Sequence, residues 1–122
     1  MFKYSYALEK FNRAIYTLAT GREDVRRRLL HVFRGELMMI RQEHLPERCR
    51  DDFQWIEKTI TKFDESSKGQ KEYFQTPNGR YDHLIPGRIE ATLRRIKNST
   101  GEKIAEKIYG IWSVLNNDFS EK

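Results

Sequence analysis

The sequence has few of the residues and motifs on which catalytic and cofactor sites depend. Its single cysteine, Cys49, excludes an internal disulfide and favours a reducing cytoplasm. Its three histidines, His31, His44 and His83, lack metal-ligand spacing such as two histidines one helical turn apart, so no metal site is predicted. No glycine-rich phosphate loop follows a candidate strand, so no nucleotide cofactor is predicted. No local signature of a nucleophile and its base identifies a catalytic residue.

Long hydrophobic runs are also missing from the sequence. The longest purely aliphatic run, LMMI at residues 37–40, is far too short to cross a bilayer. The first six residues, MFKYSY, lack the apolar core of a secretory signal. We therefore expect an intracellular, cytoplasmic protein that does not bind membranes.

The composition indicates a small helical protein with a mild excess of positive charge. Of its 122 residues, 38% are hydrophobic, which is enough for one core, and 34% are charged, which suits slender helices with much exposed surface. The 23 Lys and Arg residues against 18 Asp and Glu leave a net charge of +5. This charge favours acidic partners or nucleic acid without proving either.

Apolar spacing predicts an all-α single domain over residues 1–122, folded as an irregular bundle of four to five helices. No strand-like alternation extends beyond a few residues. The first helix should run from Ser5 to Ala19, because Gly21 stands where a helix usually ends. A third helix should begin at Pro46, which suits a first helical turn.

The second half of the chain is less regular. Residues 64–86 show no periodicity and are rich in turn-forming residues, so we expect a long, polar, flexible loop there. The fourth helix should begin near Pro86, and the Asn-Ser-Thr-Gly stretch at 98–101 should break or kink the chain before a fifth. The tail, residues 117–122, is expected to fray.

The most informative stretch is residues 20–43, which should form one long helix that starts at a capping box made by Thr20 and Glu23. One face of this helix carries the apolar residues Val25, Leu29, Val32, Phe33, Leu37 and Ile40. Glu36 projects toward the middle of that face, where a carboxylate must be paired, solvated or neutral. We expect an ion pair with an arginine or lysine of another helix; the alternative is a functional pocket with Glu36 at its base.

The opposite face of this helix is basic, and the fourth helix adds further arginines. The predicted binding residues are Arg27, His31, Arg34, Arg41, Arg88, Arg94 and Arg95. They suggest a small non-catalytic interaction or regulatory module that binds an acidic protein or nucleic acid through a basic helical face. Direct binding of RNA or DNA phosphates is a second hypothesis, and a homodimer that buries another apolar stripe is an alternative assembly. A solvated charged face without a ligand is the competing interpretation.

Residues 26–31 have the sequence Arg-Arg-Arg-Leu-Leu-His, which resembles the Arg-x4-His signature of the HEPN-family ribonucleases. Members of that family are small helical proteins whose arginine and histidine act on RNA at a dimer cleft. The resemblance implies that Arg26 would stabilise phosphate charge and that His31 would transfer a proton. Arg27 stands where the family usually has Asn, Asp or His. A HEPN-like ribonuclease is therefore the third functional hypothesis.

A wider resemblance involves residues 91–108, ATLRRIKNSTGEKIAEKI, together with residues 18–29 and the Leu45-Pro46 pair. These segments look like a set of short uncharacterised bacterial helical proteins, over most of the chain outside residues 64–86. The resemblance implies a helical fold and a bacterial or mobile-element source, and it implies no activity.

Overall fold

The computed structural model describes residues 2–63 and 86–120, and the regular elements in this part of the chain are all helical. They are α1 (Ser5–Thr20), α2 (Val25–Val32), the π-helical turn η1 (Phe33–Leu37), the 3-10 turn η2 (Gln42–His44), α3 (Glu47–Ile60), α4 (Pro86–Arg95) and α5 (Asn98–Ser120). The prediction of an all-α bundle is confirmed for these residues. None of the described helices has both the length and the apolar character that a membrane span requires. The predicted loop at 64–86 lies outside the described residues, except Pro86, where α4 begins.

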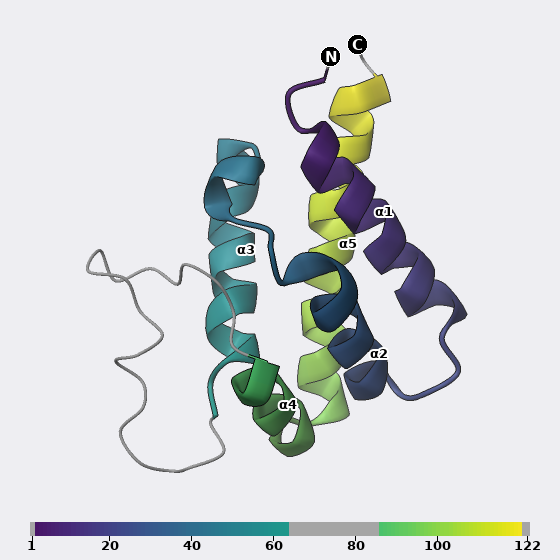
Figure 1. Ribbon diagram of the computed structural model, residues 1–122, viewed down its shortest axis with the longest axis vertical. Coiled ribbons are helices and arrows are strands. Elements are labelled where there is room, and N and C mark those ends of the chain that lie inside the picture. The colour runs from purple at the N-terminus through teal and green to yellow at the C-terminus, as the bar shows by residue number, and fades with distance from the viewer. Residues whose placement is uncertain (1, 64–85, 121–122) are drawn as a thin grey trace, which may run out of the picture.

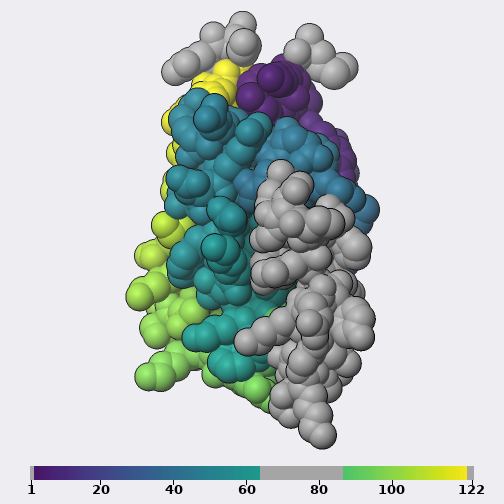
Figure 2. Space-filling model, turned by 90° about the vertical axis from the view of Figure 1, so that its left-hand side faces the viewer, coloured from purple at the N-terminus to yellow at the C-terminus, as the bar shows by residue number. Residues whose placement is uncertain are grey.

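The bundle is organised around α1 and α5, which run side by side in opposite directions and bring both termini to one end (Figure 1). α2 packs against α1, α4 and α5, while α3 packs against α4 and α5. α3 runs down the middle of the face shown in Figure 2, with α5 along one edge. Fully buried phenylalanines from three elements, Phe11, Phe33 and Phe53, fill the core between the helices. The rings of Phe11 and Phe53 meet edge to face with centroids 6.4 Å apart.

The predicted long helix over residues 20–43 begins later than expected. Thr20 is the last residue of α1, and its hydroxyl donates to the carbonyl of Tyr16 at 2.7 Å. The N-cap of α2 is Asp24, whose carboxylate accepts the backbone N–H of Arg27 at 3.1 Å. Asp24 therefore takes the role that was predicted for Thr20, because an aspartate both caps free N–H groups and complements the positive end of a helix.

The same helix also ends earlier than predicted, because it passes into the π-helical turn η1. The N–H of Met38 donates to the carbonyl of Phe33, five residues back, at 3.0 Å, so the turn holds one extra residue. Leu37, which was predicted on the apolar face, is fully buried. The Glu36 side chain is 13% exposed, and its carboxylate lies 3.7 Å from the guanidinium of Arg13 on α1. The predicted ion pair with another helix is confirmed.

Two other helix boundaries agree with the sequence, and one lies elsewhere. α1 ends one residue beyond the prediction, and α3 begins directly after Pro46. The predicted break before the fifth helix exists, but it lies at Ile96 and Lys97. Residues 98–101, which were expected to interrupt the chain, form the first turn of α5 instead. The carbonyl of Lys97 accepts the N–H groups of that turn, so the helix is already hydrogen-bonded there.

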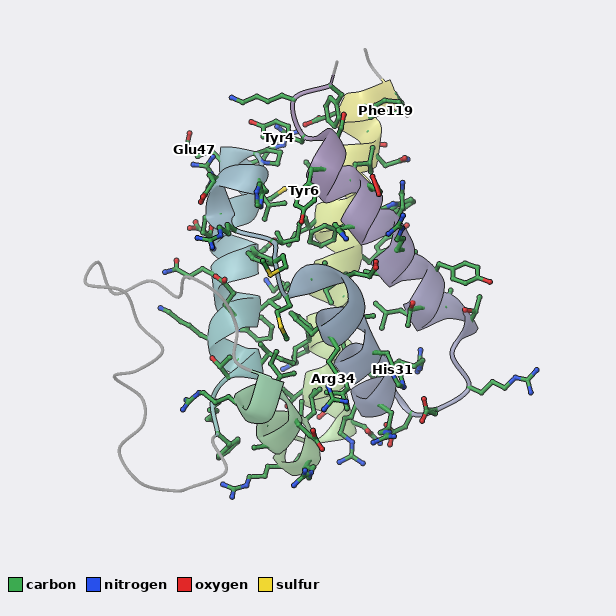
Figure 3. The ribbon with its side chains drawn as sticks, viewed as in Figure 1. Tyr4, Tyr6, His31, Arg34, Glu47 and Phe119 are labelled. Carbon is green, nitrogen blue, oxygen red and sulfur yellow. The ribbon has the colours of Figure 1, made fainter. Side chains whose placement is uncertain are left out.

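The tail predicted to fray, residues 117–122, is helical as far as Ser120, and residues 121–122 lie outside the described part of the chain. Asp118 forms an ion pair with Arg48 on α3. The ring of Phe119 lies edge to face on that of Phe2, with centroids 5.6 Å apart, near the two termini (Figure 3). These two contacts tie the last turn of α5 to the rest of the bundle, which explains why the helix continues.

Arg28 holds the short connection between α1 and α2. Its guanidinium donates to the carbonyl of Leu18 at 2.5 Å and to that of Glu23 at 2.8 Å. Its stem fills the space beside Gly21, where an added Cβ would lie 2.6 Å from the Arg28 Cγ. The φ of Gly21 is −66°, which any residue adopts, so glycine is needed here for space rather than for conformational freedom.

We expect Gly21→Ala to lower the free energy of unfolding by about 1–3 kcal/mol, because the new methyl group displaces the anchored Arg28. Gly110→Ala on α5 is the matched control. An added Cβ there has nothing within 4 Å, so helix propensity should stabilise the protein by about 0.5–1 kcal/mol. Urea unfolding of both variants measures the difference. An unchanged or increased stability of Gly21→Ala would show that Arg28 does not constrain the connection.

Candidate functional site

The basic ridge predicted on the second helix is present but shorter than expected. Arg27, His31 and Arg34 are exposed at successive turns of α2 and η1. Figure 3 shows His31 and Arg34 on the part of the bundle away from the termini. Arg41 does not extend this ridge, because the helix has ended before it. The Arg41 backbone is extended, and its N–H donates to Nδ1 of His44 at 2.9 Å.

The ridge continues onto α4 through a carboxylate, Glu90. One oxygen of Glu90 lies 2.5 Å from the Arg34 guanidinium, and the other lies 2.8 Å from that of Arg94. The hydrogen bond from Arg94 is the largest cause that lowers the pKa of Glu90 below its ordinary value, and Arg34 lowers it further. Glu90 is therefore an ionised bridge between two helices at neutral pH.

Two further carboxylates lie at the start of the ridge. Glu23 accepts hydrogen bonds from Nε2 of His31 at 3.0 Å and from Nε of Arg27 at 3.4 Å. Both hydrogen bonds lower the pKa of Glu23, and the one from His31 has the larger effect. The pKa of Asp24 is lowered chiefly by the backbone N–H of Arg27, while the guanidinium of Arg26 lies 3.3 Å from its carboxylate. Positive and negative groups thus alternate along this surface.

A cleft of about 450 Å³ separates the start of α2 from α4. It is lined by Asp24, Arg26, Arg27, Leu30, Glu90, Leu93 and Arg94. Leu30 and Leu93 are buried side chains that form its apolar floor, and more of the lining is apolar than polar. The volume falls within the range of about 300–1,000 Å³ that is usual for ligand sites.

The other two arginines predicted on α4 lie outside this cleft. Arg88 is only 4% exposed, and its guanidinium donates to the carbonyl of Thr61 at 2.6 and 3.1 Å. Its prediction as a surface binding residue is therefore wrong: it holds α4 to the end of α3, where helix carbonyls lack partners. The guanidinium of Arg95 lies over the ring of Phe63, 5.3 Å from the centroid. Of the predicted arginines on α4, only Arg94 lines the cleft.

Arg26 and His31, the pair that resembles the HEPN signature, contact different partners. The Arg26 guanidinium donates to the carbonyl of Ile96 at 3.3 Å, whereas His31 is bonded to Glu23. Within residues 2–63 and 86–120, no group of three or more His, Cys, Asp or Glu side chains is arranged to hold a metal ion.

No protein-family model, no curated protein and no solved structure matches this chain. Both sequence resemblances, to the HEPN ribonucleases and to the short bacterial helical proteins, therefore stay predictions. The function is argued below from the residues of the cleft alone.

Sequence reasoning found the charged residues of this surface and missed the contact that joins its two parts. Glu23 precedes Arg27, and Glu90 precedes Arg94, by one helical turn, which is a recognisable ion-pair spacing. The contact between Arg34 and Glu90 joins residues 56 positions apart, and no local pattern predicts it.

We expect Glu90→Gln to reduce the loss of stability in acid. The pKa of Glu90 is lower in the folded protein than its ordinary value of 4.5. Its attraction to Arg34 and Arg94 is therefore complete above that pH and is lost as the pH falls through the folded-state pKa. Urea unfolding at neutral pH and well below 4.5 should show a smaller decrease for the variant than for the wild type. Glu106→Gln on α5 removes an equal charge elsewhere, and an acid response of Glu90→Gln no smaller than that of this control would contradict the assignment.

Proposed function

We propose that this protein is a small non-catalytic interaction module whose α2–α4 surface binds an acidic segment of another protein. The observation that carries the proposal is the cleft between these helices, which combines an apolar floor with arginines from two distant parts of the chain. Arginine suits this role because its planar guanidinium binds a carboxylate through two parallel hydrogen bonds.

The charges of this surface favour an acidic partner. The arginines around the cleft and ridge are Arg26, Arg27, Arg34 and Arg94, against the carboxylates Glu23, Asp24 and Glu90. Four positive and three negative groups leave a local charge of +1 with His31 neutral. The side chains of Arg27, Arg34 and Arg94 are 60%, 49% and 64% exposed, so solvent and ligands still reach these guanidiniums.

The carboxylates also favour a protein segment over nucleic acid. A nucleic-acid backbone carries a negative charge at every phosphate, and some phosphates would face Glu23, Asp24 or Glu90. A protein segment can place its carboxylates opposite the arginines and leave neutral side chains opposite the acids. RNA or DNA binding is therefore the alternative, and the experiment below distinguishes the two.

The test measures the binding of a fluorescent glutamate- and leucine-containing helical peptide by anisotropy, beside single-stranded RNA and duplex DNA, at low and physiological salt. We expect the wild-type protein to bind the peptide. Arg34→Glu should lower the affinity about tenfold, because an attraction between opposite charges becomes a repulsion between like charges. Lys58→Glu on α3, an equal charge reversal away from the cleft, should retain wild-type affinity. Circular dichroism confirms that both variants are folded.

Two results would contradict the proposal. Equal weakening by Lys58→Glu and Arg34→Glu would mean that net charge, and not this surface, drives binding. Binding of the oligonucleotides with a steep salt dependence, and none of the peptide, would replace the proposal with the nucleic-acid alternative.

A further inference from the structure

We infer that Glu90 occupies, in the free protein, the place of a partner carboxylate, and that the adjoining cleft receives an apolar side chain from the same partner segment. The inference rests on the proposed function and specifies the partner: an acidic amphipathic segment with an apolar residue between carboxylates.

The contacts of Glu90 are those that a bound carboxylate would make. Its two oxygens meet guanidiniums from two elements, Arg34 of η1 and Arg94 of α4, at 2.5 and 2.8 Å. The Glu90 side chain is 31% exposed, so it lies at the rim and not in the core. A carboxylate from a partner can approach the same two guanidiniums from solvent, and it then competes with Glu90.

This arrangement has two opposing effects on binding. Glu90 holds Arg34 and Arg94 in place, so that a partner finds them already oriented and less side-chain entropy is lost. It also supplies negative charge that repels an incoming carboxylate. Arg34 and Arg94 are 49% and 64% exposed, so a partner carboxylate can reach both guanidiniums once Glu90 no longer competes for them. We therefore expect the repulsion to outweigh the loss of order, and removal of the Glu90 charge to strengthen binding.

The floor of the cleft indicates what lies next to the partner carboxylates. Leu30 and Leu93 line it with apolar atoms, and Arg26, Arg27 and Arg94 line it too. The methylene stems of arginines are themselves apolar. A bare anion would leave these atoms in water. An apolar side chain would cover them, exclude water from the rim and so strengthen the surrounding arginine–carboxylate pairs.

A helical segment meets both requirements with a simple pattern. Residues three and four positions on either side of an apolar residue share its face of a helix. Glutamates at those positions surround a central leucine with carboxylates, which matches an apolar floor with arginines at its rim. An extended segment offers fewer such neighbours, because only the residues two positions away on each side share the face of the apolar residue.

The experiment uses two fluorescent helical peptides that differ only at the central residue. One carries a leucine flanked at three and four positions on both sides by glutamates, and the other carries serine in place of the leucine. Both are titrated with the wild-type protein, with Glu90→Gln and with Glu106→Gln, which removes an equal charge from α5.

We expect the wild type to bind the leucine peptide about tenfold more tightly than the serine peptide, because the leucine side chain leaves water. Glu90→Gln should bind both peptides about threefold to tenfold more tightly than the wild type, since a competing carboxylate is gone. Glu106→Gln should bind them with the wild-type affinity. Gln is nearly isosteric with Glu, and urea unfolding at neutral pH shows that each variant is folded.

The outcomes separate this inference from the function on which it rests. Equal affinity for the leucine and serine peptides overturns the role of the cleft, but the proposal that the partner is acidic would still stand. Unchanged or weaker binding by Glu90→Gln overturns the role of Glu90. Binding of neither peptide by the wild type overturns the proposed function and the inference together.

Discussion

The π-helical turn from Phe33 to Leu37 is the constraint on which the rest of the structure depends. In an uninterrupted helix, Glu36 would follow Leu29 by seven residues and Phe33 by three, and it would face the core with them. A carboxylate in that position loses its hydration without a partner. With one extra residue in the turn, Leu37 stays fully buried, and the Glu36 carboxylate lies 3.7 Å from the guanidinium of Arg13 on α1.

The same turn also carries residues of the charged surface. It carries both Glu36 and Arg34, so the segment that forms an ion pair with α1 also forms one with Glu90 on α4. Beneath that exposed ion pair, the buried side chains of Leu30 and Leu93 form the floor of the cleft. Exposed ion pairs contribute little to stability, so apolar packing is what holds α2 and α4 together. The ion pair between Arg34 and Glu90 orients these two side chains at the surface.

Local sequence patterns predicted the parts of this fold that depend on local chemistry. The extent of α1, the buried face of the second helix and the exposed series Arg27, His31 and Arg34 all follow from helical periodicity. Periodicity does not show where a π-turn inserts a residue, so it placed Arg41 on a ridge that ends before it. Nor does it distinguish an arginine in solvent from one such as Arg88, whose partner is a carbonyl on another helix.

The alternation of charges at the cleft has a consequence for selectivity. Arginines alone along α2 and α4 would repel one another and would bind polyanions of any kind. Internal carboxylates remove that repulsion in the free protein and oppose any ligand that brings only negative charge. A partner of the proposed kind would therefore have to contribute something besides charge. The apolar floor at Leu30 and Leu93 is the part of the surface that could receive an apolar side chain from it. Under the proposed function, specificity is a difference between ligands: the carboxylates would weaken binding of all anions, and the cleft would restore it for those that carry an apolar side chain.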